Sequence, residues 1–355
     1  MISKAHSRLV LASMLVSSMV GAQIAPRQAL LALSKRDHTL SIVDPASLQV
    51  LAKVPVGNDP HEVIASADGK TAYVSNYGGG AYNTLAVIDL VALKPLPPVD
   101  LGPLRGPHGL TFAGGKVWFT AEAAKAIGSY DPFTGKIDWI LGTGQNRTHM
   151  IYVFDDLKRI ITTNVSSGTA SIIDKTAGRP APRSSPAPGQ PGTEPPQRAP
   201  MGPPGGDWDE TVVKVGNGSE GFDVAPDGKE LWVANAQDGT ISVIDLATKQ
   251  VTETVAANAK GANRLKFTPD GKRVFISCLG GEDEIVLDAA TRKEIKRIKL
   301  GHGAAGIQMQ PDGSRVFVAC SPDNYIAVID LKTLEVIGHL DVGTEPDGLA
   351  WATAH

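Results

Sequence analysis

Imidazole and carboxylate side chains recur in this sequence at a fixed distance from a repeated turn. Four polar residues stand seven positions before the aspartate of such a turn: His61, His149, Glu220 and Asn263. Imidazole and carboxylate groups together can act as general acid and base near neutral pH. The same groups also bind divalent metal ions. The spacing therefore predicts one shared polar site, provided that a repeating fold brings these positions together.

The repeat is marked by apolar segments that end in aspartate: Asp44, Asp89, Asp131, Asp174, Asp245, Asp288 and Asp330. Five of the six gaps between successive aspartates are 42 to 45 residues, and the gap from Asp174 to Asp245 is 71 residues. A fixed period of this size is typical of propellers and other repeat architectures. The sequence therefore predicts seven repeats, one of which carries an insertion.

Each repeat has the composition of four short β-strands. In the fifth, the turn Pro226-Asp227-Gly228-Lys229 precedes a β-rich segment at 230–234, and further segments end at Asp245 and cover 251–255. Pro-Asp-Gly supplies the preset φ and the positive φ that a tight turn needs. Four antiparallel strands in about 43 residues form a propeller blade. We expect an all-β, seven-bladed β-propeller with four-stranded antiparallel blades.

The two ends of the repeat region complement each other. Residues 29–33 match the second strand of a blade that lacks a first strand, and residues 347–351 match that missing strand. A shared blade would close the ring and leave no unpaired blade edge. We therefore expect the N- and C-terminal strands to lie in one sheet.

The innermost strands of a propeller start at one rim of the central channel, so the residues that begin them form a ring. The predicted ring is His61, His108, His149, Glu220, Asn263, Ala305 and Asp347. Loops on the same face add His38, His302, Tyr77, Arg36, Asp37, Arg105, Arg147 and Arg264. We predict a polar channel mouth that binds a ligand, with His61, His108 and His149 as metal ligands. Arginines there favour a carboxylate or phosphate on the ligand. The alternative is a solvated rim whose side chains bond only to loop backbone and water.

Two segments differ in composition from the repeats. Residues 1–22 combine basic residues, a 12-residue apolar run from Leu9 to Val20 and small residues before Gln23, which is typical of a secretory signal peptide. Residues 177–207 hold ten prolines and six glycines, and we expect a disordered insertion in blade 4. The remainder, 23–355, is predicted to be a single propeller domain that is exported to the periplasm or secreted.

Charge and cysteine content exclude several classes of partner and fold. The net charge is -3 without a basic block, so nucleic acid is not expected as a partner. No apolar run reaches the roughly 20 residues that span a bilayer, and we expect a monomer. The two cysteines, Cys278 and Cys320, occupy equivalent positions in adjacent repeats, too far apart for a disulfide. We expect both to be free thiols.

Two family resemblances follow from particular segments. The segments 54–57 (VPVG), 73–76 (YVSN) and 241–245 (ISVID) resemble the YVTN β-propeller repeat. In blade 3, 107–110 (PHGL), 117–120 (VWFT) and 131–135 (DPFTG) look like a repeat of the streptogramin (virginiamycin B) lyase family. That resemblance implies a seven-bladed propeller that opens a cyclic lactone by metal-assisted elimination. It covers one blade of seven.

Three functions remain open at this stage. The first is a binding module that presents the channel mouth to a small molecule or a protein partner. The second is a metal-assisted lyase or lactonase acting on a cyclic ester, with a ring histidine as base and a divalent metal ion stabilising the developing negative charge. The third is a haem-handling role. No Cys-x-x-Cys-His motif occurs in the sequence, which excludes covalent haem attachment.

Overall fold

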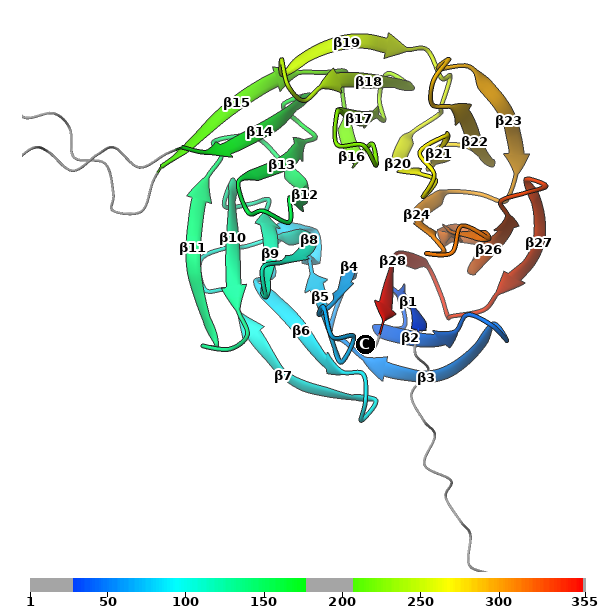
Figure 1. Ribbon diagram of the computed structural model, residues 1–355. Helices are drawn as coiled ribbons and strands as arrows, with labels where there is room; N and C mark the ends of the chain where they lie inside the picture. The colour runs from blue at the N-terminus through cyan, green and yellow to red at the C-terminus, as the bar shows by residue number, and fades with distance from the viewer. Residues whose placement is uncertain (1–27, 177–206, 354–355) are drawn as a thin grey trace, which may run out of the picture.

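Seven four-stranded antiparallel sheets, the blades, surround a central channel in the part of the chain that the computed structural model describes, residues 28–176 and 207–353 (Figure 1). In each blade, one strand lies next to the channel and three follow it outward (Figure 1). The prediction of an all-β, seven-bladed propeller is confirmed. The chain is therefore a seven-bladed β-propeller.

The first four blades use the following strands. Blade 1 contains β28 (Pro346–Thr353), β1 (Gln28–Ser34), β2 (Thr39–Asp44) and β3 (Gln49–Pro55). Blade 2 contains β4 (Pro60–Ala65), β5 (Thr71–Asn76), β6 (Thr84–Asp89) and β7 (Lys94–Asp100). Blade 3 contains β8 (Pro107–Ala113), β9 (Lys116–Ala121), β10 (Ala126–Asp131) and β11 (Lys136–Gly142). Blade 4 contains β12 (Thr148–Val153), β13 (Arg159–Asn164), β14 (Thr169–Lys175) and β15 (Trp208–Lys214).

The other three blades repeat this order. Blade 5 contains β16 (Ser219–Val224), β17 (Glu230–Asn235), β18 (Thr240–Asp245) and β19 (Gln250–Val255). Blade 6 contains β20 (Ala262–Phe267), β21 (Arg273–Cys278), β22 (Asp283–Asp288) and β23 (Glu294–Lys299). Blade 7 contains β24 (Ala304–Met309), β25 (Arg315–Cys320), β26 (Tyr325–Asp330) and β27 (Glu335–Leu340). Two short 3₁₀ turns, η1 (Gly78–Gly80) and η2 (Ser321–Asp323), lie in loops between second and third strands.

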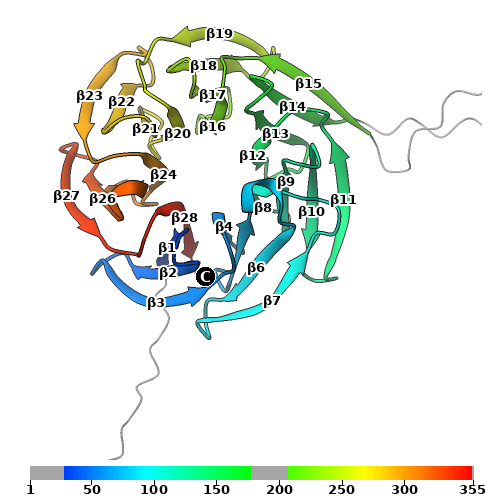
Figure 2. The same ribbon diagram turned by 180° about the vertical axis from the view of Figure 1, so that it is seen from behind.

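The ring is closed by strands from both ends of the chain. β28 pairs antiparallel with β1, with Leu31 opposite Ala350 and Gln28 opposite Thr353. Figure 2 shows β28 on the channel side of β1, with β2 and β3 following outward. The predicted closure is confirmed, and no edge strand of blade 1 faces the channel unpaired.

The repeated aspartates fix the turn between the third and fourth strands. Oδ1 of Asp245 accepts hydrogen bonds from the backbone N–H groups of Ala247 (3.1 Å) and Thr248 (2.7 Å). Equivalent bonds to the second residue after the aspartate occur at Asp44, Asp89, Asp131, Asp288 and Asp330. Asp174 differs: because the insertion follows it, its carboxylate pairs with Arg159 and Lys249 instead. The prediction that these aspartates cap turns is confirmed in six blades.

The hydrophobic core is divided among the interfaces between blades. Within residues 28–176 and 207–353 there are seven clusters of buried apolar side chains, one between each pair of neighbouring blades. Alternate residues of the second and third strands supply them, because side chains on a strand point in turn to its two faces. Stability is therefore distributed around the ring, and the channel is left free for polar side chains.

The remaining sequence predictions divide into tested and untested ones. Cys278 and Cys320 are free and buried, as expected, and burial raises the pKa of each thiol to about 12. The described residues include no helix long and apolar enough to cross a membrane. The expected signal peptide, 1–22, lies outside the described residues. So does the expected insertion, 177–207, except for Asp207.

Glycines follow four of the seven ring residues because neighbouring innermost strands approach each other closely there. A Cβ on Gly109 would lie 2.5 Å from the backbone oxygen of His149, and one on Gly221 would lie 2.5 Å from that of Asn263. Gly306 and Gly348 face the next blade in the same way. Contact with backbone cannot be relieved by turning a side chain. These positions therefore set the narrow spacing of the channel wall.

The substitution Gly109→Ala is expected to lower the free energy of unfolding by about 1–3 kcal/mol, because the added methyl forces two strands apart. Urea denaturation of the two proteins measures the difference. Gly142→Ala, in strand β11 of the same blade, is the control, since nothing lies within 4 Å of a Cβ there. Equal effects of the two substitutions would contradict this explanation.

Candidate functional site

Every residue of the predicted ring is the second residue of an innermost strand. These strands are β4, β8, β12, β16, β20, β24 and β28, and the residues are His61, His108, His149, Glu220, Asn263, Ala305 and Asp347. The counting rule therefore identifies one structural position in all seven blades. Figure 1 shows the seven strands side by side around the channel.

Hydroxyl groups of the second strands hold the backbone of this ring in place. Thr120 Oγ1 in blade 3 donates a hydrogen bond to the carbonyl of His149 in blade 4 (2.8 Å). Ser277 Oγ in blade 6 donates in the same way to Ala305 in blade 7 (2.8 Å). Because each bond joins neighbouring blades, the ring position is fixed by the packing of the blades.

The three ring histidines lie against one another. The ring centroids of His61 and His108 are 4.9 Å apart, and those of His108 and His149 are 3.8 Å apart. The phenol ring of Tyr77 meets His61 and His108 edge-on, with centroid distances of 5.0 and 5.2 Å. Blades 2, 3 and 4 therefore form one aromatic and imidazole cluster at the end of the channel.

This cluster fills the end of the channel instead of lining an open rim. His108 and His149 are each only 3% exposed, and Asn263 and Asp347 are 5% and 6% exposed. Side chains deprived of water in this way have stronger electrostatic interactions than solvated ones. The structure thus places the sequence-derived ring in a buried polar cluster.

His149 lies between two carboxylates. Its Nδ1 is 2.5 Å from Glu122 Oε1, and its Nε2 is 2.8 Å from Glu220 Oε2. Burial opposes the charged imidazole, but the charge of Glu220 and the hydrogen bonds to both carboxylates outweigh it and raise the pKa of His149. Burial likewise opposes ionisation of Glu220, yet His149, Arg264 and Arg147 lower the pKa of that carboxyl to about 2. His149 is therefore an imidazolium bound to two ionised carboxylates.

His108 has the opposite environment. Burial, followed by the nearby charges of His149 and His61, holds the pKa of His108 well below its ordinary value. Its Nδ1 is buried and has no hydrogen-bond partner among the described residues. His108 is therefore a neutral imidazole with an unused nitrogen, 3.8 Å in centroid distance from a charged one.

Glu122 is a member of this cluster that the ring count did not include. It is the first residue after β9, in the loop position that Tyr77 occupies in blade 2. Tyr77 donates a hydrogen bond from its hydroxyl to Glu122 Oε2 (2.6 Å), and the Nε of Arg147 lies 3.4 Å from the same atom. Extending the Tyr77 position across the repeats would have found it.

A second charged pair crosses the channel. Arg264 Nη2 in blade 6 lies 2.5 Å from Glu62 Oε1 in blade 2, and its Nη1 donates to Asn263 Oδ1 (3.0 Å). Burial disfavours the charge on Arg264, but Glu62 and Asp347 overcome it and raise its pKa. This ion pair joins blades on opposite sides of the ring and narrows the channel.

His61 and Asp347 form a separate group beside the cluster. His61 Nε2 is 3.1 Å from Asp59 Oδ1, and its Nδ1 is 3.6 Å from Asp347 Oδ2. Lys35 Nζ lies 3.3 Å from Asp347 Oδ2. Both nitrogens of His61 thus face carboxylates, and the structure places His61 outside the set that offers metal ligands.

The other predicted residues of this face lie further out. Arg36 pairs with Glu345 at the surface (2.5 Å), and Nδ1 of His38 accepts a hydrogen bond from the backbone N–H of Asp59 (3.4 Å). Arg105 donates to the carbonyl of Ala81, and exposed His302 lies between Asp323 and Glu282. The structure does not bring these residues to the histidine cluster. Asp37 accepts the N–H of Thr344.

One group within the described residues has the composition and spacing of a metal site. His108, Glu122 and His149 are all buried, and each offers a ligand atom within 4.8 Å of those of the other two. Two imidazoles and a carboxylate form a common ligand set for zinc and for other first-row divalent ions.

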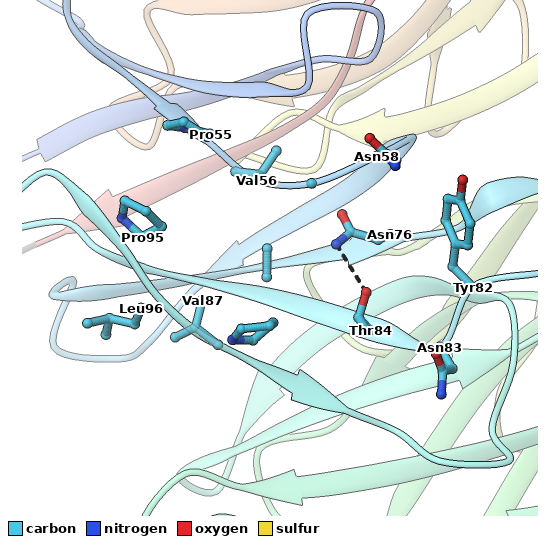
Figure 3. Close-up of a pocket in the computed structure, with 13 residues that line it drawn as sticks. Pro55, Val56, Asn58, Asn76, Tyr82, Asn83, Thr84, Val87, Pro95 and Leu96 are labelled. Carbon is cyan, nitrogen blue, oxygen red and sulfur yellow. Dashed lines mark hydrogen bonds between the residues drawn. The ribbon is translucent and has the colours of Figure 1, made fainter.

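Two cavities border this region. One, of about 280 Å³, lies in the channel beyond the ring residues and is lined by Glu62, Met150, Tyr152, Asp223, Arg264 and Lys266 among others. The other, of about 380 Å³, lies on the outer side of blades 1 and 2 (Figure 3). Pro95, Leu96 and Val87 line one side of this outer cavity, and Asn76 donates a hydrogen bond to Thr84 (3.3 Å). Since the outer cavity has no acidic, basic or imidazole side chain, the polar chemistry belongs to the channel.

A family profile matches part of the chain. The profile described as "Cytochrome D1 heme domain" matches residues 206–308, which run from β15 into β24. This segment includes Glu220, Asn263 and Arg264 but none of His61, His108 or His149. No curated protein matches the chain in sequence.

Solved structures share the fold over nearly the whole chain. A functionally unknown protein from Desulfotomaculum acetoxidans DSM 771 is 13% identical, with a TM-score of 0.72, covering 92% of this chain and 99% of that one. A putative 6-phosphogluconolactonase from Bacteroides fragilis NCTC 9343 is 16% identical, with a TM-score of 0.67, covering 94% and 99%. The dihydro-heme d1 dehydrogenase NirN in complex with DHE is 15% identical, with a TM-score of 0.61, covering 92% and 75%. At these identities the similarity shows the fold, which hosts many functions.

Proposed function

We propose that the protein binds a divalent first-row transition-metal ion at the end of its channel, through His108, Glu122 and His149. One observation carries the proposal: three buried side chains converge to within 4.8 Å, and His108 offers a buried nitrogen without a hydrogen-bond partner. Buried polar atoms in folded proteins are nearly always paired. A metal ion would supply the missing partner.

The surroundings of the three ligands suit this role. Metal ions bind the neutral form of imidazole, which is the form in which burial keeps His108. The ligands are also oriented from behind: Glu220 holds one nitrogen of His149, and Tyr77 donates to Glu122. Metal-ligating histidines commonly have such a carboxylate partner. Binding would displace the proton that His149 shares with Glu122.

The function served by this centre is, in our proposal, the binding of a small ligand at the channel mouth. A second candidate is the metal-assisted opening of a cyclic ester. It is supported by the adjacent imidazoles of His108 and His149, whose opposite pKa shifts suit a base and an acid. The fold shared with a putative 6-phosphogluconolactonase is compatible with that activity.

A haem role fits this channel poorly. The channel cavity of about 280 Å³ is smaller than the range of roughly 300–1,000 Å³ that holds drug-sized ligands, and a tetrapyrrole is larger still. The Arg264–Glu62 pair also crosses the space that a macrocycle would need. We therefore favour a metal ion and a small ligand over haem d1.

Export is a further part of the proposal and rests on residues 1–22 alone. Amino-terminal sequencing of the mature protein after expression with its leader is expected to begin at Gln23. A mature chain that retains Met1 would contradict it.

Metal binding is tested with the full chain freed of metal by chelation and then dialysed against Zn²⁺. We expect one tightly bound ion per chain. The variant His108→Ala is expected to bind zinc more than about 100-fold more weakly, beyond what loss of an outer partner of a ligand costs. His302→Ala is the control, since exposed His302 lies outside the cluster.

Equal zinc affinity in the wild type and His108→Ala would refute the proposed centre. The zinc-loaded protein is assayed in parallel for opening of δ-valerolactone. Opening that requires both zinc and His108 supports the second candidate, whereas zinc binding without it supports the binding function.

A further inference from the structure

The loops that lead into the seven innermost strands share a backbone feature. In every blade, the residue two positions before the ring residue has a left-handed φ between 49° and 71°. These residues are Asp59, Gly106, Arg147, Gly218, Gly261, Gly303 and Glu345. Glycine adopts this conformation without strain, and four blades use it.

Blades 2, 4 and 1 place a charged residue at this strained position: Asp59, Arg147 and Glu345. Aspartate tolerates the left-handed region better than long side chains do. Strain that persists where glycine would relieve it is found mainly at functional sites. Each charge must therefore be judged by what its side chain contacts.

Arg147 is the one of the three that reaches the metal-ligand cluster. Its Nε lies 3.4 Å from Glu122 Oε2 and its Nη1 lies 3.7 Å from Glu220 Oε1. Both distances exceed the 2.7–2.9 Å of a strong charge-assisted hydrogen bond. Its side chain is 42% exposed, whereas that of Glu122 is 3% exposed. Arg147 therefore lies between the buried cluster and solvent.

The donors of Arg147 are largely unused. Among the described residues its Nε–H alone donates a hydrogen bond. The other arginine of the cluster, Arg264, is 12% exposed and is held by Glu62 and Asn263. A guanidinium with free donors beside a metal site is suited to bind a carboxylate or phosphate in a two-point manner.

We propose that Arg147 binds the anionic group, carboxylate or phosphate, of the small ligand that the metal centre takes. This inference rests on the proposed metal site and specifies its ligand as an anionic small molecule. The ion and Arg147 would hold two ends of one ligand at the channel mouth. The strain at Arg147 is then explained by the need for a cation at that point.

The test uses the full chain loaded with Co²⁺, whose visible spectrum reports on its ligands, titrated with malonate in one arm and inorganic phosphate in the other. We expect a saturable spectral change with at least one of the two anions. Arg147→Gly is expected to weaken that binding by about ten-fold or more, as loss of a hydrogen-bonded charge does. Arg147→Lys keeps the charge but not the planar fork, and is expected to fall between them.

Thermal unfolding separates this role from a structural one. Arg147→Gly is expected to unfold at the same temperature as the wild type or higher, because glycine removes the backbone strain and half-exposed ion pairs contribute little. Glu345→Gly is the matched control. It changes the same loop position in blade 1, where the partner is exposed Arg36, and should leave anion affinity unchanged.

The possible failures are distinguishable. Wild-type protein that binds no cobalt refutes the metal centre, and anion-dependent thermal shifts of the metal-free chain then decide whether Arg147 binds anions. Cobalt binding with equal anion affinity in the wild type and Arg147→Gly refutes the role of Arg147 alone. A lower unfolding temperature with unchanged anion affinity would show that Arg147 is structural.

Discussion

Replacing His149 by alanine is expected to lower the free energy of unfolding of the metal-free protein by about 3–5 kcal/mol, the cost of breaking a buried ion pair. The imidazolium is 3% exposed and lies between Glu122 and Glu220, both of which it leaves as buried charges when removed. Urea denaturation in the presence of a chelator measures the loss.

The pH dependence of this loss follows from the two pKa shifts. Glu220, with its pKa lowered from 4.5 to about 2, contributes stability above pH 4.5 that is lost as the pH falls toward 2. His149, with its pKa raised above 6.5, contributes stability below pH 6.5 that is lost as the pH rises through its folded value. The difference between the wild type and His149→Ala is therefore largest between pH 4.5 and 6.5.

His302→Ala is the matched control for this substitution. His302 also lies between two carboxylates, 3.2 Å each from Asp323 and Glu282, but its side chain is 66% exposed. Exposed pairs contribute about 0–1 kcal/mol. If both substitutions cost the same, burial is not what makes the His149 pair strong.

Replacing Glu284 by leucine is expected to raise the free energy of unfolding by about 2–4 kcal/mol, since an unpaired buried polar group is removed and an apolar side chain is buried in its place. Glu284 is fully buried, and neither carboxylate oxygen has a hydrogen-bond partner among the described residues. In β22 it lies opposite Ile298. The other blades carry apolar residues at this register: Leu40, Leu85, Ile127, Ala170, Ile241 and Ile326.

The wild type should also lose stability as the pH rises. Burial raises the pKa of Glu284 well above 4.5, so its contribution is fully present below pH 4.5 and declines as the pH rises toward the folded value. Glu284→Gln, which cannot ionise, is the control and should lack this decline. Thermal unfolding across pH measures both effects, and a leucine variant less stable than the wild type would contradict the explanation.

Much of the fold could be predicted from the sequence because its signals are local and repeated. The aspartates at the third turn, the Asp-Gly turns and the complementary ends specify blade number, strand order and closure. The same periodicity gave the ring, since His61, His108 and His149 occupy equivalent positions in consecutive blades. Equivalent positions in a closed repeat lie at equal height in the channel.

The contents of the candidate site were less accessible. Glu122 comes from a different loop position than the ring residues and reaches His149 because blades 3 and 4 pack together. His61 and His108 are both second residues of innermost strands, yet His61 faces Asp59 and Asp347 while His108 has an unpaired nitrogen. Periodicity gives a residue's position but not its partners on neighbouring blades.

The sequence by itself determined the seven blades, their closure and the ring of polar residues, because these depend on spacing along the chain. The tertiary structure alone decided which groups are buried, which are charged and which lack a partner. Those properties depend on contacts between blades: the carboxylates around His149, the unpaired nitrogen of His108 and the exposed donors of Arg147. Desolvation and neighbouring charge set a group's chemistry, and neither is encoded in its spacing.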